Sequence, residues 1–150
     1  MDKYTQFSMF LANKPGVLSK IFAELAKSKV NVSSIALMDS TEHGVLRMVV
    51  EDAKSARPVL KSLNVPMQET EVLGVKLPNR VGAAADLCDR LAKKRISVTY
   101  MYCTSGAKGG KTLVVLKVPD IKKAIKVLEA TKSTARDMKV KLRRPTTKRR

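Results

Sequence analysis

A short turn rich in helix-starting residues precedes the first amphipathic segment of the chain. It reads Asn13-Lys14-Pro15-Gly16-Val17-Leu18. The first N–H groups of a helix have no intrahelical partner and lie at the positive end of its dipole, so they suit a carboxylate or a phosphate. Gly16 permits close approach of the backbone to a ligand, and the Asn13 side chain is able either to cap the helix or to bind that ligand. The turn is the first candidate site, although the same residues also commonly start a helix that binds no ligand.

Residues suited to catalysis are few. His43 is the only histidine, and it falls in a predicted polar loop with no nucleophile near it in sequence. A general base needs a proton within hydrogen-bond reach, so an exposed His43 is the favoured interpretation. Strand alternation and helix capping account for the nearby carboxylates of Asp39, Glu42, Glu51 and Asp52. We therefore predict no catalytic residues and no enzyme.

The cysteines and the apolar runs indicate the compartment. Cys88 and Cys103 fall on a predicted helix and a predicted strand, without a Cys-x-x-Cys pair or a histidine cluster. This pattern favours small buried thiols in a reducing compartment over a disulfide or a zinc site. No apolar run approaches the length of about 18 residues that spans a membrane, and the N-terminus does not resemble a signal peptide. We expect a soluble cytoplasmic protein with no metal, no cofactor and no membrane partner.

An internal repeat positions the candidate residues. The turn at residue 13 recurs at residue 79 as Asn79-Arg80-Val81-Gly82-Ala83-Ala84, an offset of 66 residues. After the next loop the offset is 68, because Met48 matches Leu116 and Leu60 matches Leu128. A loop lengthens at little entropic cost, whereas a helix or strand loses its register. The chain is therefore two copies of one folded unit.

Hydrophobic spacing predicts the same element order in both copies: strand, helix, strand, strand, helix, strand. This order is that of ferredoxin-like folds, so we predict an α+β protein with two βαββαβ domains and antiparallel sheets. Asn13 is predicted to cap the first helix, with Pro15 in its first turn. The remaining elements are strands at residues 5–12, 31–38, 45–51, 66–73, 73–77, 97–103, 112–118 and 138–142, and helices at residues 53–63, 83–94 and 121–132.

The repeat sets the domain boundaries. We predict domains at residues 1–72 and 73–142, followed by a basic tail at residues 143–150. Domains of this size bury a modest fraction of their surface, so we expect a homodimer. No Pro-rich or Ser-rich linker separates the copies, which predicts two sheets held closely together.

The formal net charge of +17 raises a second interpretation. Residues 131–150 hold nine Lys or Arg against one Asp, and the other 130 residues hold 21 basic and 12 acidic side chains. Clustered cations attract any polyanion, so a protein or nucleic-acid interaction module using the basic surface and tail is the alternative. RNA-recognition motifs stack bases on aromatic residues of the first and third strands, but residues 45–51 and 112–118 contain none. A solvated tail is favoured over a dedicated nucleic-acid element.

Three further side chains have two interpretations each. Arg47 is predicted to point away from the core, where it meets an acidic ligand or, as we favour, pairs with Glu51 or solvent. Tyr100 and Tyr102 share one strand face, and packing between the domains is favoured over a binding surface.

The repeated motif resembles that of the ACT domain, a regulatory module that binds amino acids. The family signature is Asp/Asn-x-Pro-Gly-x-Leu at the start of the first helix, followed by an Asn between two hydrophobic residues at the start of the second strand. Residues 13–18 and Val30-Asn31-Val32 match it. The resemblance covers residues 3–142 and extends to small stand-alone tandem ACT proteins.

The resemblance implies a non-catalytic regulatory protein that binds a free amino acid, or a similar small carboxylate, at an interface between ACT domains. The N–H groups around Gly16 would take the carboxylate, and Asn13 and Asn31 would hold the amino group or side chain. The candidate ligand-binding residues are Asn13, Lys14, Pro15, Gly16, Val17, Leu18, Asn31, Asn79 and Gly82.

The second copy departs from the family pattern. Val81 replaces Pro, Ala84 replaces Leu and Ser97 replaces Asn, so we expect its site to be weaker, altered or structural. Leu11 stands where serine-binding members carry a histidine, so the resemblance does not imply serine as the ligand.

Overall fold

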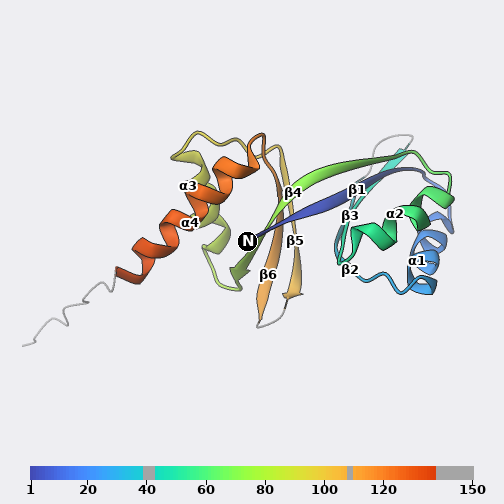
Figure 1. The fold of residues 1–150 in the computed structure, drawn as a ribbon, viewed down its shortest axis with the longest axis horizontal. Coiled ribbons are helices and arrows are strands. Elements are labelled where there is room, and N and C mark those ends of the chain that lie inside the picture. The colour runs from blue at the N-terminus through green and yellow to red at the C-terminus, as the bar shows by residue number, and fades with distance from the viewer. Residues whose placement is uncertain (39–42, 108–109, 138–150) are drawn as a thin grey trace, which may run out of the picture.

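The computed structural model describes residues 1–38, 43–107 and 110–137 (Figure 1). The predicted α+β class and the repeated strand and helix order are confirmed. The predicted strand at residues 138–142 and the tail lie outside the described residues. In chain order the elements are β1 (Asp2–Ala12), α1 (Val17–Lys27), β2 (Val32–Met38), β3 (His43–Val50), α2 (Ala53–Ser62), β4 (Met67–Pro78), α3 (Ala83–Ala92), β5 (Tyr100–Ala107), β6 (Lys111–Lys117) and α4 (Ile121–Asp137).

Strand β4 is shared by the two repeats. The described strands form one antiparallel sheet in the order β2-β3-β1-β4-β6-β5. Residues 67–74 of β4 pair with β1, and residues 73–78 pair with β6. The strands predicted separately at residues 66–73 and 73–77 are therefore one strand, and the predicted boundary after residue 72 falls inside it.

Each repeat has its own hydrophobic core beneath its own helices. Phe7 and Met9 of β1 pack with Leu25 of α1 and its neighbours in the first core. In the second core, Leu73 of β4 packs with Leu87 of α3. Figure 1 shows α1 and α2 at one end of the molecule and α3 and α4 at the other, with the strands between them.

The faces of the sheet without helices turn toward each other. A third cluster, to which both repeats contribute, comprises Val49, Val72, Leu113 and Val115, with Tyr4 and Tyr102 packed against it. The two edge strands also meet, because Ser34 Oγ lies 2.7 Å from Thr104 Oγ1. The order of layers is thus helices, one half of the sheet, the other half, helices. The two sheets predicted separately are halves of one continuous sheet, and these halves are held closely together as predicted.

The repeat extends to the backbone. Gly16 and Gly82 are the N-caps of α1 and α3, with φ of +85° and +84°. Lys29 and Arg95 follow the same two helices, and each has φ of +54°. Glycine adopts this left-handed conformation without the steric cost that other residues meet, so its recurrence before both helices reflects a demand of the turn.

Several element boundaries differ from the prediction. The N-cap of α1 is Gly16 rather than Asn13, because the left-handed Gly16 interrupts helical geometry and leaves Pro15 before the helix. Strand β5 spans residues 100–107 instead of 97–103, so it extends through the small residues Ser105, Gly106 and Ala107. Helix α4 continues to Asp137.

The predicted burial of the cysteines is wrong. Cys88 and Cys103 are free and exposed. Cys88 follows the buried Leu87 and lies on the outer side of α3, whereas Cys103 lies on the edge strand β5. A helix or edge strand buries one side only, so neither position requires a buried side chain.

Gly74 generates a stability prediction for the shared strand. A Cβ at this buried position would lie 2.3 Å from Cε2 of Tyr4. Gly74→Ala should destabilise the protein by about 1–3 kcal/mol in urea unfolding, because the ring must move within a packed layer. Gly44→Ala is the matched control, since its nearest contact is 3.6 Å. In a Tyr4→Ala background the cost of Gly74→Ala should fall, and an unchanged cost would contradict this explanation.

Candidate functional site

The turn between β1 and α1 is open and lacks a carboxylate of its own. Residues 12–16 are exposed, and a Cβ placed on Gly16 meets no atom within 4 Å. Helix α1 has no side-chain cap hydrogen bond and no acidic residue in its first turn. The positive end of the helix dipole therefore faces solvent, and an external carboxylate would find both the N–H groups and the favourable potential.

The turn between β4 and α3 has the same backbone with different electrostatics. Asp86 lies in the first turn of α3 and forms an ion pair with Arg80. Arg80 also donates a hydrogen bond to the Val81 carbonyl oxygen at 3.0 Å, and its Nη1 lies 3.6 Å from a Cβ placed on Gly82. This helix start thus has an internal carboxylate and an arginine over the turn. Asn79 is exposed beside them.

The structure does not bring Asn31 to the turn at Asn13 within one chain. Met38 pairs with Val45 near the end of the sheet that leads to Asn13, whereas Val32 pairs with Val50 toward the other end. Asn31 precedes Val32, so the length of β2, roughly 20 Å at the usual rise per residue, separates it from that end. The two turns are apart as well, because α1 and α3 lie at opposite ends of the molecule (Figure 1).

A buried polar cluster joins the two repeats between the halves of the sheet. Gln6 is fully buried, and its Nε2 donates to Ser8 Oγ at 2.9 Å and to Tyr100 Oη at 2.8 Å. Tyr102 Oη donates to Gln6 Oε1 at 3.0 Å. Burial raises the pKa of the Tyr102 hydroxyl, which keeps it protonated as a donor. The prediction that the tyrosines pack between the domains is confirmed.

The sequence reasoning missed Gln6, because alternation places it on the face of β1 opposite the helix-covered core. The burial of that face does have a sequence signal. Leu113-Val114-Val115-Leu116 is a continuous apolar run, and such runs are typical of strands buried on both faces. Had this run been taken to indicate a sheet covered on both faces, a buried hydrogen-bond partner for Tyr100 and Tyr102 would also have been predicted.

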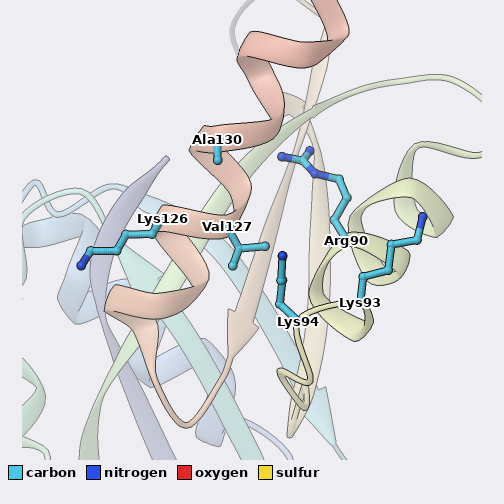
Figure 2. Close-up of a pocket in the computed structure, with 6 residues that line it drawn as sticks. All are labelled: Arg90, Lys93, Lys94, Lys126, Val127 and Ala130. Carbon is cyan, nitrogen blue, oxygen red and sulfur yellow. The ribbon is translucent and has the colours of Figure 1, made fainter.

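A basic groove of about 350 Å³ lies between α3 and α4. Figure 2 shows Arg90 and Lys94 directed into the gap between the helices, with Lys93 and Lys126 directed outward. Arg90 donates to the Leu128 carbonyl oxygen, which ties the two helices together. Lys93 pairs with Asp89 at 2.6 Å. The groove is part of the basic surface predicted to attract anions.

The described residues contain little that suits catalysis. His43 is exposed, as predicted, but it is the first residue of β3 rather than part of the loop before that strand. The Asp52 carboxylate caps α2, and hydrogen bonds from the Ser55 hydroxyl, then from the Ser55 and Lys54 N–H groups, hold the pKa of Asp52 below its usual value. Across residues 1–38, 43–107 and 110–137, no cluster of three metal-ligating side chains occurs, and no helix is long and apolar enough to span a membrane.

Most of the sequence matches a known family. The family model of the ACT domain pair matches residues 3–138. None of the curated proteins is similar enough in sequence to match the chain.

Several solved structures share the fold. Protein BT0572 from Bacteroides thetaiotaomicron is 32% identical, with a TM-score of 0.79 over 87% of this chain and 89% of that one. The ligand-free regulatory subunit of aspartate kinase from Thermus thermophilus has a TM-score of 0.62 at 13% identity, over 86% of this chain and 91% of that one. The same subunit from Thermus flavus has a TM-score of 0.58 at 17% identity, over 90% and 94%.

The Gln6 cluster generates a prediction about the contact between the repeats. Gln6→Leu should destabilise the protein by about 1–3 kcal/mol in urea unfolding, because two partly buried tyrosine hydroxyls lose their partner. Gln68→Leu, at an exposed position of β4, should change stability by less than about 0.5 kcal/mol. Adding Tyr100→Phe and Tyr102→Phe to Gln6→Leu should restore part of the loss. A further loss on adding them would contradict the proposed role of Gln6.

Proposed function

Because this chain belongs to the family of ACT domain pairs, we propose that it is a non-catalytic regulatory protein that binds a free amino acid, or a similar small carboxylate, in the turn before α1. The observation that carries the proposal is the open start of α1, which has neither a side-chain cap nor an acidic residue in its first turn. The N–H groups of Gly16 and Leu18 take the carboxylate, joined by that of Val17, whose long hydrogen bond to the Lys14 carbonyl oxygen, 3.5 Å, the ligand would replace. Asn13 and Lys14 lie beside it with exposed side chains.

A second chain completes the site. Strand β2 is at the edge of the sheet, and its Ile35 and Leu37 are 48% and 55% exposed. Antiparallel pairing of β2 with β2 of another copy would cover these side chains through a two-fold interface. It would also place Asn31 of the second chain beside Met38, at the end of the sheet that carries Asn13. A homodimer thereby brings Asn13 of one chain and Asn31 of the other to the same site, although these two residues are far apart within one chain.

The second turn is proposed to have a structural role. Asp86 already occupies the start of α3 with a carboxylate, and Arg80 neutralises it. A ligand carboxylate would meet the negative charge of Asp86 and displace Arg80 from the turn, both at a cost in free energy. Asn79 and Gly82 therefore contribute less to binding than Asn13 and Gly16.

The interaction-module alternative has less support. Recognition of single-stranded RNA on a sheet needs an open sheet face with aromatic side chains. Here the face without helices is closed by the other half of the sheet, and Gln6 at its centre is fully buried. The basic groove between α3 and α4 is the place where the described residues would meet a polyanion.

The function is tested by a melting-temperature screen over the standard amino acids. At least one amino acid should raise Tm at millimolar concentration. At 100 times its Kd, a ligand that binds only the folded state adds about 2.7 kcal/mol to the free energy of unfolding. Gly16→Val should abolish this shift, because a β-branched residue does not tolerate φ of +85°. Gly82→Val is the matched control: it introduces the same strain at φ of +84° but should keep the shift. No shift for any amino acid, or equal loss in both variants, would overturn the proposal.

A further inference from the structure

A separate cavity of about 240 Å³ opens between the two halves of the sheet. It lies on the face without helices, beside the Gln6 cluster, and none of the residues of the turn before α1 lines it. Both repeats contribute side chains to it. The polar and charged residues among its lining that bear on a ligand are Ser8, Arg47 and Thr70 from the first repeat and Thr99, Tyr100 and Lys117 from the second.

Arg47 is a half-buried cation in this cavity without a carboxylate partner. Its guanidinium lies 3.9 Å from the centroid of the Tyr100 ring, and its Nη1 donates to Met38 Sδ at 3.1 Å. Among the ion pairs of the described residues none involves Arg47, so the expected pairing with Glu51 is absent there. A guanidinium that is partly removed from water gains from an anion more than an exposed one does.

Lys117 places a second positive charge at the same cavity. It is half-buried and lies opposite Tyr100 in the pairing of β5 with β6. Its ammonium group donates to the backbone oxygen of Glu71 at 3.3 Å, and none of the residues that line the cavity is acidic. Arg47 and Lys117, from different repeats, both line this cavity, which also contains hydroxyl donors, and Lys117 lines a neighbouring pocket with Glu71 and Asp120 as well.

We propose that this cavity binds a small anion with two negative charges, such as a dicarboxylate or inorganic phosphate, which bridges the two repeats. Arg47 recognises one charged group through paired N–H donors, and Lys117 neutralises the other. The hydroxyls of Ser8, Thr70 and Thr99 supply further hydrogen bonds. The cavity is smaller than the 300–1,000 Å³ typical of drug-sized ligands, which suits a small anion. The site does not depend on the amino-acid site proposed above.

The test is calorimetric titration of the full chain with succinate and with inorganic phosphate, each at an ionic strength held constant with sodium chloride. Arg47→Gln and Lys117→Gln should each weaken binding of the better anion by roughly tenfold or more, as expected for a lost charge-assisted hydrogen bond. Lys54→Gln removes one charge from an exposed position of α2 and should leave the Kd unchanged. Gly16→Val should also bind the anion normally, which separates this site from the amino-acid site.

Comparison of succinate with inorganic phosphate distinguishes a dicarboxylate ligand from a phosphate ligand. Preference for succinate assigns a dicarboxylate site, and preference for phosphate assigns a phosphate site. Absence of binding by either anion to the wild-type chain would overturn the proposal. So would equal weakening in Lys54→Gln, because binding would then follow the net charge. If Arg47→Gln does not fold, Lys117→Gln decides the question, since the Lys117 ammonium group donates to a backbone oxygen, that of Glu71, and forms no ion pair among the described residues.

Discussion

The pairing of β1 and β6 on the two sides of one strand, β4, fixes the arrangement of the molecule. At Leu73 and Gly74 the strand has a neighbour on each side, so the two repeats cannot separate without breaking a continuous ladder. Because β1 and β4 are antiparallel, the turns that follow them leave at opposite ends of the molecule. The geometry that joins the repeats therefore prevents one chain from bringing its two ACT-type turns together.

Because β4 runs through both repeats, the helix-free faces of the two halves of the sheet come into contact. The layer between them contains both apolar and polar side chains. Apolar side chains such as Val72 and Val115 fill most of the layer, while Gln6 satisfies two tyrosine hydroxyls within it. Buried hydrogen bonds contribute little net stability but are costly to leave unmade, so they fix one register of the repeats. The cavity in this layer is lined by two cations, Arg47 and Lys117, whereas the interior of the layer is mostly apolar.

Much of this fold follows from the sequence. Equal spacing of apolar residues in two copies predicts the element order and both glycine turns, and the tyrosine pair predicts the contact between the repeats. Local patterns do not encode which strands become neighbours, so the continuity of β4 and the burial of Gln6 emerge only from the assembled sheet. Local patterns also do not encode the separation of Asn13 from Asn31, because it depends on strand direction. The difference between the two turns was visible in Val81, but its electrostatic cause, the pairing of Arg80 with Asp86, was not.

The central claim is that two chains build one amino-acid site, and mixing two defective variants tests it most directly. Asn13→Ala and Asn31→Ala should each lose binding of the amino acid identified in the melting screen. After the two are unfolded and refolded together, half of the dimers are mixed, and each mixed dimer has one intact site. Calorimetric titration should then recover about a quarter of the wild-type sites at wild-type affinity. No recovery from a mixture that forms dimers would contradict the account, because both residues would then act within one chain.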